Sequence, residues 1–408
     1  MSEKLAIDGG TPVRVAPWPS WPMWDEREEK ALLEVLHSGV WNDRGNGKIA
    51  EFEKKFSAYQ HAAYGMCVPS GTSSLELSLL ALGVGPGDEV ITSSYTFTAS
   101  AAAIFQVGAL PVLADVEPGT LNLDPADVER RITPRTKALM PVHIGGQPAD
   151  MDGILAVAKR HGLPVVEDAC QAWGAAWAGK RVGALGQLGG FSFQASKNIN
   201  AGEGGFIVTN DADLYERVWA LHNAGRSPTR SRHEPPFTGY NYRMTEFQAA
   251  ILLAQLERLP EHLALREANA ACLDEMLDEI PGITPRQRPP QVTSSALHLY
   301  MFNYQAASFG GLPRADLIKT LQAEGIPCSP GYQPLYRAVG YRRLLAERNG
   351  LLQPWEEPQG DLPTQEPCPA CEKACEETVW LNQWQLLADR RAMEDIATAI
   401  RKIQAAKA

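Results

Sequence analysis

The alternation of strand-like and helix-like segments constrains the fold of this chain more than any other feature. Short apolar runs that suit β-strands lie at residues 63–68, 89–92, 110–116, 137–144, 164–170, 191–194 and 205–208. Between most of them apolar residues recur at helical spacing, and three of these stretches end on a glycine, as helices often do. Repeated β-α units predict an α/β fold with a largely parallel sheet that helices cover on both faces.

The second half of the chain predicts a further folding unit. A long helical pattern starts at Thr245 and ends at a polar, proline-rich connection. Beyond it the signals are mixed, with a strand at residues 297–305 and helices at residues 313–325 and from 389 on. A chain of 408 residues, 44% of them hydrophobic, favours two domains. We expect an N-terminal arm and a large domain over residues 1–260, and a small α+β domain over residues 261–408 that starts within or after the long helix.

Charge and composition narrow the classes of partner. The chain carries 38 Lys and Arg against 48 Asp and Glu, a net charge of −10, which does not favour nucleic acid or anionic lipid. The first residues lack the basic start and apolar run of a signal peptide, and nowhere do 18 apolar residues follow one another. The seven cysteines are an odd number, which indicates free thiols in a reducing compartment. We expect a cytoplasmic protein that binds small molecules, with no nucleic-acid or membrane partner.

Three of these cysteines, Cys368, Cys371 and Cys375, form the only cluster with spacings that suit a metal. No fourth ligand and no second CxxC pair lies near them. Cys371 and Cys375 are also four positions apart, as core positions on one helix face are. The spacing therefore favours packing over a zinc site, and we expect no metal centre.

Functional residues in an open α/β sheet lie beyond the carboxyl ends of the strands. After the first strand, backbone N–H groups of Gly71, Thr72 and Ser73 could hold an anion at a helix N-terminus, although a plain helix cap has the same sequence. After the second strand come Tyr95 and Phe97, whose rings could cover a flat cofactor or pack in the core. This edge of the sheet is therefore a candidate binding site.

A carboxylate and a lysine follow two later strands. Glu167 and Asp168 end an apolar strand, where a carboxylate needs a cation such as a protonated pyridine nitrogen, or serves as a helix cap. Lys197 lies between a strand and a glycine cluster, where it is either a solvated loop residue or an amine that condenses with a carbonyl. The possible anion cradle, the aromatic cover, the acid and the lysine arrive in chain order at the ends of successive strands, so four weak signals together are evidence for one site.

Five segments resemble the fold-type I pyridoxal-phosphate enzymes and, within them, the DegT/DnrJ/StrS-type sugar aminotransferase family. The segments are "SGTSSLELSLLALGVGPGDEVI", "VEDACQAWGA", "FSFQASKNINAGEGG", "GYNYRMTEFQAAILLAQLERL" and "ETVWL". The resemblance spans nearly the whole chain, and it is strongest to the branch of scyllo-inosose and 2-deoxy-scyllo-inosose aminotransferases and 3-amino-5-hydroxybenzoate synthase. It implies a mostly parallel seven-stranded sheet in the large domain and pyridoxal 5'-phosphate as cofactor.

The resemblance also implies a role for individual residues. Lys197 resembles the lysine that forms a Schiff base with the cofactor, and Asp168 the partner of its ring nitrogen. Asn241 is similar to an asparagine that reaches the phosphate in the neighbouring subunit, which implies a homodimer with shared active sites. Gln171 stands where many relatives carry histidine, next to the phenolic oxygen of the cofactor. The implied cofactor-binding residues are Gly71, Thr72, Ser73, Phe97, Asp168, Gln171, Ser192, Lys197 and Asn241.

Substrate contacts are less well defined by the sequence. A loop carries Arg226, Arg230, Arg232 and Arg243, which could meet a donor carboxylate or a nucleotide diphosphate, although a solvated basic loop explains the first three equally well. Further candidates fall in segments that line the site in relatives, and core packing is the competing interpretation of each. These are Tyr95, His143, His298, Tyr300 and Tyr332.

The implied reaction moves an amino group from glutamine or glutamate to a keto-cyclitol or a keto-sugar. Alternatives are a nucleotide-sugar aminotransferase and an aromatising enzyme of the 3-amino-5-hydroxybenzoate synthase type. A sugar dehydratase of this family would carry histidine in place of Lys197, and a non-catalytic homologue would not need both Lys197 and Asp168. The sequence leaves the acceptor open, because either a free cyclitol or a nucleotide-linked sugar is compatible with the arginine loop.

Overall fold

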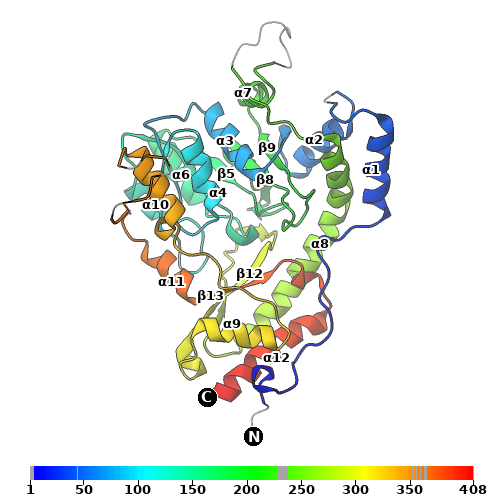
Figure 1. The fold of residues 1–408 in the computed structure, drawn as a ribbon, viewed down its shortest axis with the longest axis vertical. Helices are drawn as coiled ribbons and strands as arrows, with labels where there is room; N and C mark the ends of the chain where they lie inside the picture. Colours follow the sequence, from blue (N-terminus) through cyan, green and yellow to red (C-terminus); the bar gives the residue numbers. More distant parts are fainter. Residues whose placement is uncertain are drawn as a thin grey trace.

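A mostly parallel sheet forms the centre of the N-terminal part of the chain (Figure 1). The computed structural model describes residues 4–43, 45–227, 238–351, 353–354, 356–358, 360–362 and 365–407. One ladder has the order β3 (Leu110–Ala114), β2 (Glu89–Ser93) and β4 (Thr136–Met140), and the other has the order β5 (Val166–Asp168), β8 (Leu188–Ser192), β9 (Gly205–Thr209) and β1 (Tyr64–Val68). Parallel bridges from Leu139 to Val165 and from Val142 to Asp168 join the ladders into a sheet of seven strands. Within this sheet, β9 alone runs in the opposite direction to the other strands.

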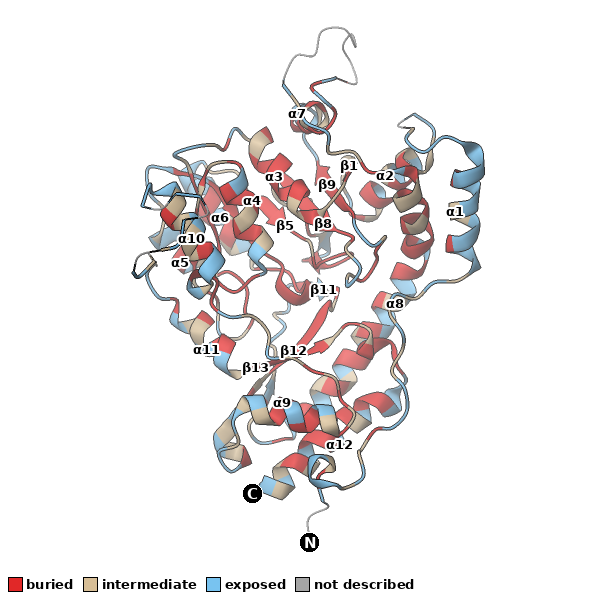
Figure 2. Ribbon diagram, viewed as in Figure 1, coloured by how far each residue is buried: buried red, intermediate tan, exposed pale blue. Residues whose placement is uncertain are grey.

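Helices cover the sheet as the β-α alternation predicts. They are α2 (Lys48–Tyr59), α3 (Gly71–Ala81), α4 (Thr98–Gln106), α5 (Pro125–Arg130), α6 (Met151–His161) and α7 (Ala212–His222). On α2, Ile49, Phe52 and Phe56 recur at helical spacing and pack in the core against Phe193 and Phe206. In Figure 2 the strands and α3 are mostly buried, so α3 packs closely against the sheet.

The long helix α8 (Glu246–Asp278) connects this core to a second one. Leu252 and Leu259 pack with the sheet, whereas Leu273 and Leu277 pack in a core built from the C-terminal elements. These are an antiparallel sheet of β10 (Ile283–Pro285), β12 (Leu299–Tyr304) and β13 (Thr378–Asn382), together with α9 (Arg314–Ala323) and α12 (Arg390–Lys407). We propose that the domain boundary at residues 260 and 261 lies where α8 passes from one core to the other. Leu5 packs in the second core, so the start of the arm lies on the small C-terminal unit.

Further helices and short strands complete the described part of the chain. They are α1 (Glu26–Ser38), the short strands β6 (Ala176–Trp177), β7 (Lys180–Arg181) and β11 (Val292–Ser294), and the helices α10 (Val339–Arg348) and α11 (Pro369–Glu377). The strand expected at residues 137–144 ends at Met140, because Pro141 has no N–H to donate to a ladder. In the described part of the chain, no helix is long and apolar enough to cross a membrane.

The cysteine cluster lies in a third apolar core. Cys368, Cys371 and Cys375 are all buried there, and the Sγ atoms of Cys371 and Cys375 are 4.0 Å apart on α11. Among the described residues, no group of three or more His, Cys, Asp or Glu side chains is arranged to hold a metal ion. The three side chains therefore contribute to packing.

Candidate active site

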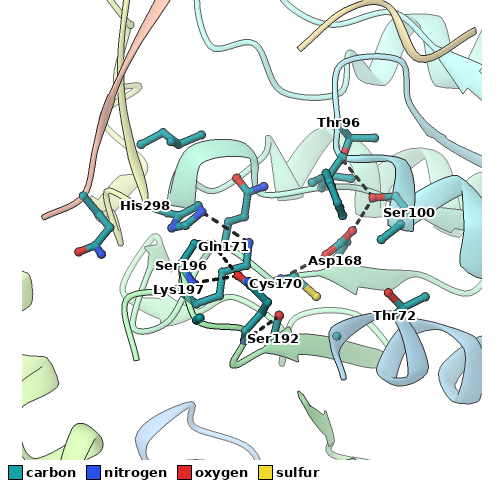
Figure 3. Close-up of a pocket in the computed structure, with 18 of the residues that line it drawn as sticks. Thr72, Thr96, Ser100, Asp168, Cys170, Gln171, Ser192, Ser196, Lys197 and His298 are labelled. Atoms are coloured by element: carbon teal, nitrogen blue, oxygen red, sulfur yellow. Dashed lines mark hydrogen bonds between the residues drawn. The ribbon is translucent and has the colours of Figure 1, made fainter. Parts of the chain in front are cut away.

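A cavity of about 950 Å³ lies at the carboxyl ends of β5 and β8 and the N-termini of α3 and α4. It lies where an open α/β sheet is expected to bind ligands. Figure 3 shows the polar side chains that project into it. Of the residues singled out from the sequence, the cavity is lined by Gly71, Thr72, Phe97, Asp168, Gln171, Ser192, Lys197, His298 and Tyr332. Residues from the two halves of the chain thus meet in one site.

Asp168 presents a fixed carboxylate at the end of β5. The side chain is buried, and its Oδ2 accepts a hydrogen bond of 2.7 Å from the Ser100 hydroxyl (Figure 3). Its Oδ1 accepts the backbone N–H of Cys170 at 3.2 Å, and Thr96 lies 3.0 Å from Ser100. Both carboxylate oxygens thus accept hydrogen bonds at the edge of the cavity, and a carboxylate in this position suits a cationic partner there.

Lys197 lies beside a neutral histidine. Its Nζ is 3.5 Å from Nε2 of His298. Burial lowers the pKa of Lys197, while Cys170 and Asp168 act to raise it. Burial also lowers the pKa of His298 well below its ordinary value, and the charges of Lys197 and Arg266 lower it further. Burial therefore makes the amine of Lys197 easier to deprotonate than a free lysine, and the deprotonated amine is the form that attacks a carbonyl.

The tautomer of His298 follows from its other neighbours. Asn198 donates through Nδ2 to the carbonyl of Ala296 at 2.6 Å, so its Oδ1 is the atom that faces the histidine. That oxygen lies 3.1 Å from Nδ1 of His298, which must carry the proton. The lone pair of Nε2 is then free to accept a hydrogen bond from Lys197.

The N-terminus of α3 forms the end of the cavity that suits an anion. A Cβ atom at Gly71 would lie 2.6 Å from the Cβ of Ser192 and 2.9 Å from the Sγ of Cys170, so only glycine fits there. The N–H groups of Gly71 and Thr72 belong to the first helical turn, which has no acceptors within the helix. The side chain of Ser73 is a correction to the predicted set, because it does not line the cavity. Its hydroxyl accepts the N–H of Ser70 in a capping box and donates to the Ser70 carbonyl.

Gln171 has a fixed amide orientation in the cavity wall. Its Oε1 accepts the N–H of Gly145 at 2.7 Å, and its Nε2 donates to the hydroxyl of Tyr332 at 3.2 Å. The second hydrogen on Nε2 is therefore available to a ligand in the cavity. Phe97 lies nearby with its ring 57% exposed, as a side chain that covers a flat ligand would be.

Three predicted substrate contacts lie outside the cavity, and their assignment is corrected. Tyr95 is fully buried and accepts a hydrogen bond of 3.0 Å from the indole N–H of Trp380. Tyr300 donates to Asp274 at 2.6 Å. His143 is fully buried beside Glu167. In each case the core-packing interpretation describes the observed position, because the polar atom already has a partner within the protein.

Glu167 organises the face of β5 opposite Asp168. Its carboxylate accepts the backbone N–H groups of Gly183, Leu185 and Gly186 at 2.7, 2.7 and 2.6 Å. Nε2 of His143 lies 3.0 Å from the same carboxylate, and Nδ1 of His143 accepts the N–H of Ala149 at 3.0 Å. Glu167 therefore bonds to groups of the protein interior, whereas the neighbouring Asp168 faces the cavity.

The residues predicted from the arginine loop do not reach the cavity of their own chain. Arg226 and Asn241 are exposed, and Arg243 donates to Asn223 at 3.2 Å. None of the three lines the cavity. Arg230 and Arg232 lie outside the described residues. The assignment of Asn241 to the site of a partner subunit remains a proposal.

Sequence reasoning missed several residues of the site. Ser100 is the clearest, since it lies on the first turn of α4 directly after the Phe97 segment, where a hydroxyl facing the strand ends could have been suspected. Trp21, Ser329, Asn382 and Trp384 also line the cavity. They come from the arm and the C-terminal unit, and no local pattern links them to the strand ends.

The comparisons with known proteins agree with this site. The model of the DegT/DnrJ/EryC1/StrS aminotransferase family matches residues 22–401. This chain belongs to that family. It is 41% identical to an L-glutamine:2-deoxy-scyllo-inosose aminotransferase of Streptoalloteichus tenebrarius over 99% of this chain and 98% of the relative. It is 43% identical to a GDP-perosamine synthase of Caulobacter vibrioides over 80% of this chain and 87% of the relative. The crystal structure of a 3-amino-5-hydroxybenzoic acid synthase matches with a TM-score of 0.86 and 34% identity, covering 97% of this chain and 100% of that one.

Family membership confirms the fold class, the aminotransferase activity and pyridoxal phosphate as the cofactor. The residues of the cavity fit that cofactor. A helix N-terminus kept open by Gly71 suits the phosphate, the buried Asp168 suits a protonated ring nitrogen, and the amine of Lys197 suits the aldehyde. The chemistry of the donor set therefore agrees with the family assignment.

Proposed function

We propose that this aminotransferase moves the amino group of L-glutamine to a keto-cyclitol. The observation that carries the proposal is the convergence of Lys197, Asp168 and Gln171 in one cavity of a chain that matches a glutamine-dependent cyclitol aminotransferase from end to end. The reaction belongs to the biosynthesis of aminocyclitols. We further propose a cytoplasmic homodimer, which the odd number of free cysteines and the exposed Asn241 support.

The residues of the cavity have distinct tasks in this proposal. When bound, pyridoxal phosphate supplies an electron sink for the charge that forms at the reacting carbon. Asp168, oriented by Ser100, keeps the ring nitrogen protonated. Lys197 would hold the cofactor through its Nζ atom, and its amine would move a proton between two substrate atoms. His298 offers Nε2 as an acceptor to that amine and so orients it.

Gln171 and the N-terminus of α3 hold the cofactor at opposite ends. The free hydrogen on Nε2 of Gln171 can be donated to the phenolic oxygen, and the N–H groups of Gly71 and Thr72, with the hydroxyl of Ser192, can be donated to the phosphate. We propose that Asn241 of the partner subunit completes the phosphate site. Phe97, which lines the cavity, would cover one face of the cofactor ring.

Two alternatives concern the acceptor and the reaction type. The similarity to a GDP-perosamine synthase favours a nucleotide-linked keto-sugar as acceptor. The similarity to 3-amino-5-hydroxybenzoic acid synthase favours an aromatising elimination on the same cofactor. Both alternatives retain Lys197 and Asp168, so the identity of the substrate must decide between them.

A two-step assay tests the function. The purified holoenzyme is mixed with L-glutamine alone, and we expect the visible absorbance of the bound cofactor to convert to the ultraviolet absorbance of its amino form. The amino form is then mixed with a keto-cyclitol, with a GDP-linked keto-sugar or with an aminoshikimate-type precursor. Return of the visible band with the keto-cyclitol, and release of an aminocyclitol detected by mass spectrometry, support the proposal. Return only with the GDP-linked sugar, or an aromatic product, contradicts it, and Lys197→Ala provides the inactive control.

A further inference from the structure

The aromatic segment before α1, residues 16–24, supplies part of the cavity wall. Trp21 and Pro22 line the cavity, and the indole N–H of Trp21 donates to the carbonyl of Ala195 at 3.0 Å. Ala195 lies two positions before Lys197, although 174 positions separate it from Trp21. The segment is therefore part of the surroundings of the reacting amine.

The segment is fixed on both sides of Trp21. The indole N–H of Trp18 donates to the carbonyl of Gly325 at 2.9 Å, and its ring lies edge-on to that of Trp384 with 6.1 Å between the centroids. On the other side, the carbonyl of Met23 accepts Nε2 of Gln255 at 2.9 Å. These contacts hold the wall in one position, which a specific binding surface requires.

One side of the Trp21 ring is occupied by protein. The guanidinium carbon of Arg266 lies 5.6 Å from the ring centroid, and Arg266 is fully buried and does not line the cavity. It donates to the backbone carbonyl and the Oε1 atom of Gln383, which keep it in place. Trp21 itself is half-buried and lines the cavity, so part of its surface borders the space that a ligand would fill.

The wall that shares this space with Trp21 mixes aromatic and neutral polar groups. Ser329, Tyr332, Asn382 and Trp384 line the same cavity. A saturated ring with hydroxyl groups matches such a surface, because its C–H face packs on an indole while its hydroxyls bond to amide and hydroxyl groups at the rim. An open-chain amino acid offers no ring face. The groups that fit the cofactor, Asp168 among them, lie on the strand ends instead.

We propose that Trp21 is the platform on which the ring of the amino acceptor stacks, and that it discriminates for the acceptor and not for the amino donor. The inference rests on the proposed function for the class of acceptor. Trp21 thus acts on substrate specificity, whereas Lys197 and Asp168 act on the chemistry common to both half-reactions.

The test measures the two half-reactions of the holoenzyme separately by rapid mixing. The variants are Trp21→Ala and Trp21→Phe, with Trp24→Ala as the matched control, since Trp24 is on the same segment, 71% exposed, and does not line the cavity. We expect Trp21→Ala to lower the kcat/KM of the acceptor half-reaction about tenfold or more and the donor half-reaction less than about twofold. We expect Trp21→Phe to keep most of the acceptor activity and Trp24→Ala to match the wild type.

Two outcomes overturn the inference. Equal losses of rate in both half-reactions would mean that Trp21 holds the lysine loop through Ala195. Equal losses of acceptor activity in Trp21→Phe and Trp21→Ala would mean that the indole N–H matters and not the ring face. A binding measurement adds a readout that does not need turnover. By calorimetry, the affinity of the amino-form enzyme for the acceptor reduced to its alcohol should fall about tenfold in Trp21→Ala.

The failure of the proposed function can be distinguished from the failure of this inference. If the wild type aminates only a nucleotide-linked sugar, the proposed acceptor is wrong, and the same ratio of half-reactions is then measured with that sugar. An unchanged ratio in Trp21→Ala with the acceptor that the wild type does use overturns the role of Trp21.

Discussion

Burial of the Lys197 amine lowers the stability of the folded protein, and the proposed function requires this buried position. Its ordinary pKa is 10.5, and burial lowers that value in the folded protein. The unfolded chain therefore binds a proton more tightly than the folded one, so between the folded pKa and 10.5 the stability rises with pH. Below the folded pKa the cost is present in full, and above 10.5 it disappears.

This argument predicts a pH-dependent gain of stability on removing the amine. In the cofactor-free protein, we expect Lys197→Met to be more stable than the wild type at pH 7, by a difference that shrinks as the pH approaches 10.5. Urea unfolding of both proteins at pH 7, 9 and 10 measures the difference. A difference that does not vary with pH would mean that the amine is not desolvated in the folded state.

The contact between Ser100 and Asp168 predicts a graded loss of activity. Ser100→Ala removes one hydrogen bond to a carboxylate, which costs about 1.5–3 kcal/mol and corresponds to about a ten- to hundredfold change. Asp168→Asn removes the charge itself, so we expect a loss of at least about a hundredfold with the fold unchanged. Thr96→Val, which only loses the contact to Ser100, should have the smallest effect. The rate of the glutamine half-reaction measures all three, and an Asp168→Asn variant with normal kinetics would remove Asp168 from the mechanism.

At the level of elements, α1 is attached to α8 by a buried charge cluster. Glu28 on α1 is 4% exposed and pairs with Arg258 of α8, while Nε2 of Gln255 donates to the same carboxylate at 2.7 Å. A buried ion pair adds little net stability when intact, but breaking it leaves an unpaired charge. The position of α1, and of the aromatic segment that leads into it, thus depends on this pair.

We expect Glu28→Ala to lower the free energy of unfolding by about 3–5 kcal/mol. Glu34→Ala is the matched control, since Glu34 lies on the same helix and pairs with Lys48 near the surface, where such a pair contributes little to stability. Urea unfolding measures both variants. Similar effects of the two substitutions would contradict the distinction between buried and exposed pairs on α1.

Much of the element pattern was predictable from the sequence because its signals are local. The start of α1 at a capping Asp25 and the end of α6 at Gly162 are encoded within a few residues. The antiparallel direction of β9 could not be predicted from the sequence, because the direction of a strand depends on partners far along the chain. Likewise Lys197 and Asp168 could be singled out at strand ends, whereas Trp21 and Ser329 enter the cavity only through tertiary packing.

At the scale of the whole molecule, the exposed aromatic residues support an assembly of two subunits. Trp41 and Tyr240 lie outside the cavity and are each more than half exposed in the single chain. Asn241 follows Tyr240 and is exposed as well. These observations support the proposed homodimer with shared active sites.

A mixed dimer tests whether the sites are shared. If Asn241 completes the phosphate site of the partner, Asn241→Ala should weaken cofactor retention by about ten- to hundredfold and leave subunit association intact. Combining a Lys197→Ala subunit with an Asn241→Ala subunit should place both lesions in one site, so about half of the wild-type activity should remain. A heterodimer with both sites impaired would show that Asn241 acts within its own subunit.

The set of hydrogen bonds on Glu167 has a consequence for the accuracy of folding. A slip of β5 by one residue would exchange Glu167 and Asp168 between the two faces of the sheet, and composition alone would not oppose it because both are acids. On the face opposite the cavity, the longer side chain of Glu167 accepts the three backbone N–H groups and contacts His143. These contacts therefore select the register of the strand, and they ensure that the shorter carboxylate is the one that reaches the cavity.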